Sequence, residues 1–107
     1  MSYVKISEPA ETPEEGRGKC IPLEHPLTGV KYVLALFQVD GKYFALTDQC
    51  SKCGGSLGRG ALNGWFAFCS MNECAWNIKK GYCKFDRSTV LPTYKVTVED
   101  DGLYIHI

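Results

Sequence analysis

The sequence has no excess of charge of either sign. Its 107 residues include 12 Lys or Arg and 12 Asp or Glu, so the formal net charge is zero. Nucleic-acid-binding domains usually carry a basic excess, so this balance argues against a nucleic-acid partner. Long apolar runs are absent too, since none approaches the roughly 20 residues that a membrane-spanning helix needs. We therefore expect no membrane span.

An apolar leader is also missing. The N-terminal stretch MSYVKISEPAETPEEG carries acidic side chains and lacks the hydrophobic core that a secretory signal needs. We therefore expect a cytoplasmic protein. In a reducing cytoplasm, clustered cysteines serve more often as metal ligands or redox groups than as structural disulfides.

Other absences bear on the class of protein. The sequence contains no internal repeat, no heptad pattern and no long run with the 3.6-residue period of an amphipathic helix. It also contains no phosphate-binding loop, no nucleophile beside a base and no pair of carboxylates in a pocket-like context. These absences disfavour both a helical architecture and an enzyme with its own substrate site.

Short β-type segments separated by tight turns make up most of the chain. Asp40–Gly41 lies between two runs of β-branched and aromatic residues, and Asn63–Gly64 and Asp101–Gly102 repeat this arrangement. Such pairs favour hairpins, because a type I′ turn needs positive φ at both central positions. Further short strands are expected near Tyr3–Ile6 and Lys19–Leu23. The pattern predicts an all-β fold, either an antiparallel β-sandwich or a small barrel.

Four of the six cysteines form two short clusters. Cys50 and Cys53 have the spacing C-x-x-C, and Cys69 and Cys74 have the spacing C-x-x-x-x-C. Each cluster follows a strand-like run, so a common sheet would bring the two cysteine-bearing loops together. Four thiolates suit Zn²⁺ in a tetrahedral site. They equally suit a [2Fe–2S] or a [4Fe–4S] cluster, so the spacing predicts a metal centre of one of these kinds.

Interpretations without a metal remain open. Cys53 and Cys74 would be able to form a disulfide between the loops, or the thiols could be small core residues. A redox dithiol at the C-x-x-C pair is disfavoured, because no βαβ unit is visible. Cys20 and Cys83 lie outside the two clusters, and we expect each to be a plain thiol.

Several stretches carry a resemblance to a known family. They are KYVLALFQVDGKYFALTDQC before the first loop, GGSLGRGALNG before the second, WN followed by GYC, and the terminal LPTYKVTVEDDGLYIHI. In these stretches and in its length, the chain resembles the Rieske-type iron–sulfur domains, especially the small ferredoxins that serve ring-hydroxylating dioxygenases. The resemblance implies a single domain over residues 1–107, folded as an all-β Rieske-like antiparallel sandwich. It also implies a small two-loop cluster-binding subdomain at approximately 48–83, with Cys50 and Cys69 as the family's two cysteine ligands.

The residues at the family's two histidine positions depart from its pattern. Where the family's loops read C-x-H and C-x-x-H, this sequence has Lys52 and Asn72. Neither an ammonium nor an amide is a good iron ligand. Cys53 follows the first position by one residue, and Cys74 follows the second by two. We therefore expect an all-cysteine centre in which Cys53 and Cys74 replace the two histidines.

The interpretation that follows is a small iron–sulfur electron-transfer protein, most simply with a [2Fe–2S] cluster. Two thiolates in place of two neutral imidazoles add negative charge, so the reduction potential is expected to fall toward the plant-type value near ~−400 mV. The resemblance implies a redox protein as partner, either a reductase or a terminal oxidoreductase or oxygenase. Such a protein is an electron carrier or accessory subunit and not an enzyme. Leu57, Met71 and Trp76, beside the loops, are expected to form an apolar rim or to pack locally.

The alternative is a Rieske-like structural or interaction subunit. A closed Cys₄ zinc site would pin the two loops together without redox chemistry, and a site with no metal would leave plain thiols. Ligand softness and a scaffold with room for two metals favour iron–sulfur over zinc.

Overall fold

The computed structural model describes residues 3–52, 54–70 and 74–107, and its regular structure is almost entirely β-strand. The strands are β1 (Tyr3–Ser7), β2 (Gly18–Glu24), β3 (Lys31–Val39), β4 (Lys42–Thr47), β5 (Leu62–Asn63), β6 (Phe66–Phe68), β7 (Ala75–Asn77), β8 (Tyr82–Cys83), β9 (Asp86–Val90), β10 (Thr93–Tyr94), β11 (Val96–Glu99) and β12 (Gly102–His106). A short 3-10 turn, η1 (Pro9–Glu11), joins β1 to β2. The predicted all-β class is confirmed. Within the ranges described, no helix is long and apolar enough to cross a membrane.

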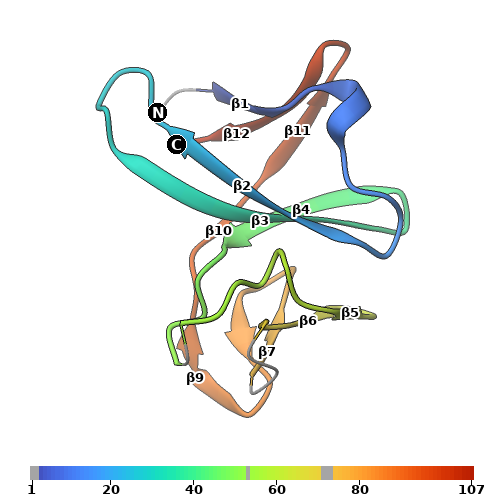
Figure 1. The fold of residues 1–107 in the computed structure, drawn as a ribbon, viewed down its shortest axis with the longest axis vertical. Coiled ribbons are helices and arrows are strands. Elements are labelled where there is room, and N and C mark those ends of the chain that lie inside the picture. Colours follow the sequence, from blue (N-terminus) through green and yellow to red (C-terminus); the bar gives the residue numbers. More distant parts are fainter. Residues whose placement is uncertain (1–2, 53, 71–73) are drawn as a thin grey trace.

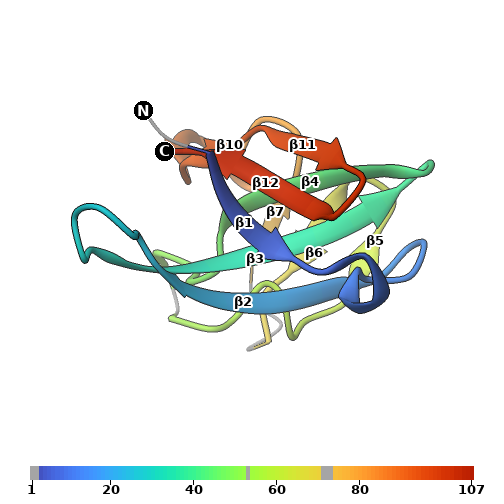
Figure 2. The ribbon, with the colours of Figure 1, turned by 90° about the horizontal axis from the view of Figure 1, so that it is seen from above.

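The strands form three antiparallel sheets stacked as layers. Their strand orders are β1-β12-β11, β10-β4-β3-β2 and β5-β6-β7-β8-β9. Figure 1 shows the first sheet at one end, the β2–β4 sheet in the middle and the β5–β9 sheet at the other end. Seen from above, β12 and β11 lie over β3 and β4 (Figure 2). The middle sheet is therefore covered on both faces.

Strand β3 contributes buried side chains to the core on both faces of the middle sheet. Leu34, Ala35, Leu36 and Phe37 are all buried, although successive side chains of a strand point to opposite faces. Leu34 and Leu36 pack with residues of β1 and β12, while Ala35 and Phe37 pack with the cysteine-bearing sheet. Because each face meets a different layer, this strand has an unbroken apolar run instead of the alternation that a half-exposed strand shows.

The three predicted hairpins all form, but only one has the turn that was expected. In the β3–β4 turn both Asp40 and Gly41 have positive φ, at 56° and 72°, as a type I′ turn requires. In the β5–β6 hairpin Asn63 pairs with Phe66, so the turn falls on residues 64–65 with Gly64 at φ 60°. That turn therefore falls one residue later than predicted. The β11–β12 turn falls one residue earlier than predicted, on residues 100–101, because Glu99 pairs with Gly102 and Gly102 already belongs to β12. The type I′ prediction is wrong for these two hairpins.

Candidate metal centre

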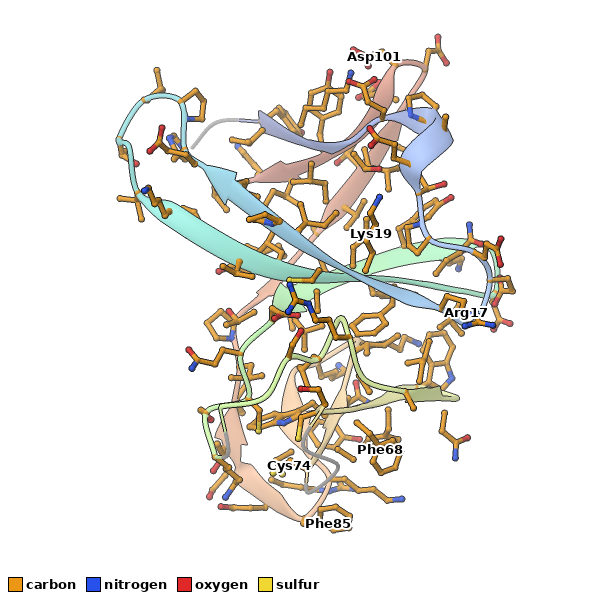
Figure 3. The ribbon with its side chains drawn as sticks, viewed as in Figure 1. Arg17, Lys19, Phe68, Cys74, Phe85 and Asp101 are labelled. Carbon is orange, nitrogen blue, oxygen red and sulfur yellow. The ribbon has the colours of Figure 1, made fainter. Side chains whose placement is uncertain are left out.

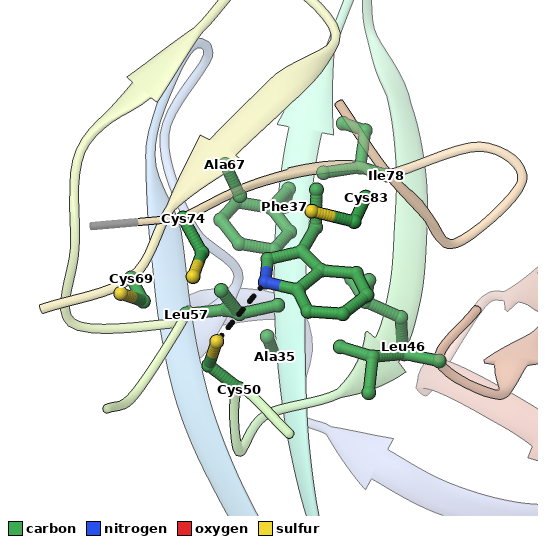
Figure 4. Close-up of a cluster of buried hydrophobic side chains, with 12 residues drawn as sticks. Ala35, Phe37, Leu46, Cys50, Leu57, Ala67, Cys69, Cys74, Ile78 and Cys83 are labelled. Carbon is green, nitrogen blue, oxygen red and sulfur yellow. Dashed lines mark hydrogen bonds between the residues drawn. The ribbon is translucent and has the colours of Figure 1, made fainter. Parts of the chain in front are cut away.

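Three of the four predicted ligands converge in the structure. The Sγ atoms of Cys50, Cys69 and Cys74 all lie within 4.8 Å of one another. Each residue is buried, at 1%, 2% and 7% relative exposure respectively. Figure 4 shows the three side chains next to each other in the apolar cluster. Cys53, the fourth predicted ligand, lies outside the described residues.

The centre occupies one end of the molecule. Figure 3 places Cys74 and Phe85 at the end opposite Asp101 in the β11–β12 turn. Cys50 follows β4 in a first loop, and Cys69 directly follows β6 at the start of a second. The prediction that both cysteines lie just past strand ends is confirmed.

The first loop is closed on itself by a buried carboxylate. Asp48 is only 5% exposed, and its Oδ1 accepts hydrogen bonds from Ser56 Oγ at 2.9 Å and from the Gly58 amide at 2.7 Å. The Cys50 amide donates to the Gly55 carbonyl at 2.8 Å, and the Gly54 amide returns to the Cys50 carbonyl at 2.8 Å. Gly54 has φ 78°, a conformation that favours glycine. Cys50 is thus held at the base of a rigid loop.

The two loops are joined directly to each other. The Ser70 amide donates to the Ser56 carbonyl at 2.9 Å, and the Ser56 amide donates to Ser70 Oγ at 2.9 Å. Within the second loop, the Cys69 amide donates to the Cys74 carbonyl at 3.0 Å. These hydrogen bonds hold the two cysteine-bearing loops in register with each other.

Two glycines of the first loop allow close approach of neighbouring backbone. A Cβ at Gly58 would meet the Cys20 amide nitrogen and Asp48 Oδ1 at 2.7 and 2.9 Å. A Cβ at Gly60 would collide with the carbonyl of Phe68, the residue that precedes the cysteine of the second loop. Neither position has positive φ, so the need for glycine here is steric.

Trp76 makes a contact that was not foreseen. Its indole Nε1–H donates a hydrogen bond to Cys50 Sγ at 3.3 Å, and both residues are buried. Of the two alternatives for Trp76 and Leu57, local packing is confirmed and the apolar rim is not, because both residues are fully buried in the core cluster; Met71 lies outside the described residues. No sequence signal separates a buried tryptophan that packs from one that also points its N–H at a thiol.

Lys52, at the first of the family's histidine positions, is not placed as a metal ligand. Its ammonium forms an ion pair with Asp86 Oδ2 at 3.0 Å, and this hydrogen bond raises the pKa of Lys52. Asp86 also accepts hydrogen bonds from Ser88 and Thr89. Together, and with Ser88 contributing most, these donors lower the pKa of Asp86 well below its usual range. Asn72, at the second position, lies outside the described residues.

The remaining two cysteines stay outside the group of three thiols. Cys20 lies half-buried in β2, and burial, followed by the nearby Asp48, raises the pKa of its thiol. Cys83 lies buried in β8 opposite Trp76 and belongs to the apolar cluster. Both positions agree with the expectation of plain thiols.

Comparison with known proteins gives a coherent answer. No family model matches the chain. A 3-phenylpropionate/cinnamic acid dioxygenase ferredoxin subunit of Photorhabdus laumondii is 29% identical over 111 residues, covering 100% of this chain and 96% of that protein. The ferredoxin component of a p-cumate 2,3-dioxygenase system of Pseudomonas putida is 31% identical over 78 residues, covering 71% of this chain and 66% of that protein.

Solved structures agree with these relatives. The ferredoxin of Sphingomonas yanoikuyae B1 superposes with a TM-score of 0.76 at 22% identity, covering 99% of both chains. A 2-oxoquinoline 8-monooxygenase component described by its Rieske [2Fe–2S] centre gives a TM-score of 0.80 at 22% identity, covering 98% of this chain and 26% of that one. In sequence likeness and in fold, the chain is a Rieske-type ferredoxin domain.

Proposed function

We propose that the protein is a small electron carrier whose iron–sulfur centre is held by Cys50, Cys53, Cys69 and Cys74. The observation that carries the proposal is the convergence of three buried thiols from two loops on a Rieske-type fold. Relatives named as ferredoxin subunits of dioxygenase systems support the electron-transfer role.

The donor set fits an iron–sulfur centre. Thiolates are soft ligands that select iron–sulfur clusters or zinc over Mg²⁺ and Ca²⁺. Cys50, Cys69 and Cys74 offer three such sulfurs, and Cys53, three residues after Cys50, is the natural fourth. When bound, a [2Fe–2S] cluster would supply reversible one-electron chemistry. The buried cysteines and the apolar cluster around them would exclude water from the centre.

The charge of the ligands sets the expected potential. Four thiolates carry two more negative charges than the two thiolates and two imidazoles of a Rieske centre, so they oppose reduction more strongly. The cation of Lys52 lies on the same loop, but Asp86 pairs with it and cancels most of its effect. We therefore expect a potential close to the plant-type value near ~−400 mV and far below the Rieske range of about −150 to +300 mV.

The partners follow from the relatives. Ferredoxin components of dioxygenase systems imply one protein that supplies electrons and one that consumes them. For this chain we propose a reductase as donor and a terminal oxidoreductase or oxygenase as acceptor, both of which must work at low potential.

A redox titration followed by visible absorption tests this function. The expected result is one reversible one-electron wave near ~−400 mV. A potential within the Rieske range would contradict the all-cysteine ligand set, and the absence of any wave would contradict the electron-transfer role.

A second candidate, a closed zinc site in an interaction subunit, is favoured by the spacing of the sulfurs. Ligands of one tetrahedral Zn²⁺ lie about 3.8 Å apart, given a Zn–S distance near 2.3 Å. Ligands on the two irons of a cluster are separated by the sulfide bridge and lie further apart. The three described sulfurs, all within 4.8 Å of one another, are closer to the arrangement around a single ion.

A further inference from the structure

The indole of Trp76 is held rigidly beside the thiol group. Trp76 is the central residue of β7, which pairs with β6 on one side and β8 on the other. Its relative exposure is 0%, and its neighbours in the core cluster include Phe37, Leu46 and Leu57. At the end of the strand, the side chain of Asn77 accepts hydrogen bonds from two amides of the following turn. A ring fixed in this way has little freedom to redirect its N–H.

That N–H points at a metal-ligand candidate. Nε1 lies 3.3 Å from Cys50 Sγ, and Figure 4 marks this bond inside the apolar cluster. An indole N–H is a donor only, and a buried one needs an acceptor. A neutral thiol is a weak acceptor, whereas hydrogen bonds to charged groups are roughly twice as strong as neutral ones. The contact therefore fixes the direction of the Cys50 sulfur and becomes stronger when that sulfur binds a metal ion as its thiolate.

We propose that Trp76 is a positioning residue of the metal centre. Its N–H holds the sulfur of Cys50 toward those of Cys69 and Cys74 and stabilises the negative charge of the Cys50 thiolate. The inference rests on the proposed metal-binding role of these cysteines, but it holds for an iron–sulfur cluster and for a single ion alike. Groups that hydrogen-bond to a metal ligand typically contribute about 10- to 100-fold in metal affinity.

The test uses Co²⁺ as an optical probe of the thiolates. The chain is stripped of metal and titrated with Co²⁺ in competition with a chromophoric chelator, and the thiolate-to-cobalt charge-transfer band is recorded. Trp76→Phe keeps an aromatic ring but removes the N–H donor. We expect it to bind Co²⁺ about tenfold more weakly or worse, with a shifted charge-transfer band. Unchanged affinity together with an unchanged band would overturn the proposal.

Trp65 provides the matched control. It is the only other tryptophan, its ring packs against Phe44 with centroids 5.4 Å apart, and Lys79 Nζ lies 4.4 Å above it. Trp65 is partly buried and packs against the same apolar cluster as the cysteines. Trp65→Phe makes the same chemical change without removing the donor to Cys50, and it is expected to leave the Co²⁺ affinity and the band unchanged. An equal loss in both variants would mean that general packing, and not the N–H donor, supports the site.

A second substitution covers the case in which Trp76→Phe folds poorly. Site-specific incorporation of 3-benzothienylalanine at position 76 keeps the bicyclic shape and replaces the N–H by sulfur. We expect the same weaker Co²⁺ binding, with native-like unfolding; native affinity in this variant would overturn the proposal.

The outcome is separable from that of the proposed function. Cobalt binding needs only the thiols, so a chain that lacks iron and sulfide as purified but binds Co²⁺ more weakly after loss of the N–H would refute the electron carrier and retain the role of Trp76. A native chain that binds no Co²⁺ through thiolates would overturn both.

Discussion

At the scale of single residues, the six cysteines divide into four candidate ligands and two internal controls. Cys50→Ser and Cys69→Ser are expected to abolish metal binding, because each removes a buried sulfur from the group of three thiols. Cys20→Ser and Cys83→Ser remove thiols outside that group and are expected to keep the native metal content. Metal per chain, measured for each variant after purification without oxygen, checks this division.

The two cysteines that we propose as replacements for the family's histidines give the more discriminating part of this experiment. Cys53→Ser and Cys74→Ser are expected to lose the metal as well. Native metal content in both variants would refute the substituted-ligand hypothesis. Loss of metal in Cys83→Ser would show that the metal site lies deeper in the core than we propose.

The hydrogen bonds that Asp86 accepts, first from Ser88 and then from Lys52, predict a pH dependence of stability. The pKa of Asp86 is lower in the folded chain than its ordinary value, so ionised Asp86 stabilises the fold at pH values above about 4, and this contribution is lost progressively as the pH falls below that value. Asp86→Asn is therefore expected to unfold at a lower urea concentration at pH 7, by a small amount because the ion pair of Asp86 with Lys52 is exposed.

The difference between the urea concentrations at which Asp86→Asn and the native chain unfold should become smaller as the pH is lowered through the acidic range. Urea unfolding at a series of pH values measures it, and Asp100→Asn in the exposed β11–β12 turn is the control. A difference that stays constant down to acidic pH would show that the carboxylate charge is not the source of the stabilisation.

The sequence identified the ligand candidates but not the groups that position them. Cys50, Cys69 and Cys74 could be predicted to approach each other, because each of the two cysteine clusters follows a strand and the hairpin between the clusters can be recognised in the sequence. Whether they bind metal, together with Cys53, stays a prediction. The bonds of Asp48 and of Trp76 could not be foreseen, since they depend on how distant segments meet once the layers have packed.

At the scale of elements, the hairpins show what turn residues determine. Asp40–Gly41 occupies the two central positions of its turn, as predicted. Asn63–Gly64 and Asp101–Gly102 are displaced by one residue, because cross-strand pairing fixes the register and the turn takes whatever residues remain. The presence of a hairpin could therefore be predicted from the dipeptide, but its register could not.

Contact between the two loops makes Gly60 a critical position. Gly60→Ala would press a methyl group against the carbonyl of Phe68 and displace the start of the second loop. We expect a loss of about 1–3 kcal/mol in the free energy of unfolding, together with weaker Co²⁺ binding. Urea unfolding and the chelator competition assay measure the two effects.

Gly29 is the control for this substitution. It has φ 73°, and a Cβ there would meet nothing within 4 Å. Gly29→Ala is expected to lose about 1–2 kcal/mol of stability from backbone strain alone, with native metal affinity. Native Co²⁺ affinity in Gly60→Ala would contradict the steric account of the loop contact.

At the scale of the whole molecule, two apolar clusters lie on opposite faces of the middle sheet. One contains Leu36 with residues of β1 and β12, and the other contains Leu57 with the three cysteines. Leu36→Ala and Leu57→Ala are each expected to lose about 2–5 kcal/mol of unfolding free energy. Only Leu57→Ala should also weaken Co²⁺ binding, and equal effects on Co²⁺ binding would contradict the separation of the clusters.

The all-β class of the fold could be predicted from the sequence, but the way in which its sheets are layered could not. Alternating strands and turn residues indicated an antiparallel all-β fold, and the resemblance supplied the Rieske-like arrangement. The four consecutive buried residues of β3 could not be assigned to faces from the sequence, because an unbroken apolar run fits any doubly covered strand. The single-domain boundary at 1–107 and the cytoplasmic location stay predictions.

The most direct test of the electron-carrier proposal is the content of iron, acid-labile sulfide and zinc per chain, measured on protein purified without oxygen, with a visible spectrum of the same sample. The account predicts iron and sulfide in near-equal amounts with visible charge-transfer bands. About one zinc per chain and no colour would contradict it and would make the centre a structural site that pins the two loops together.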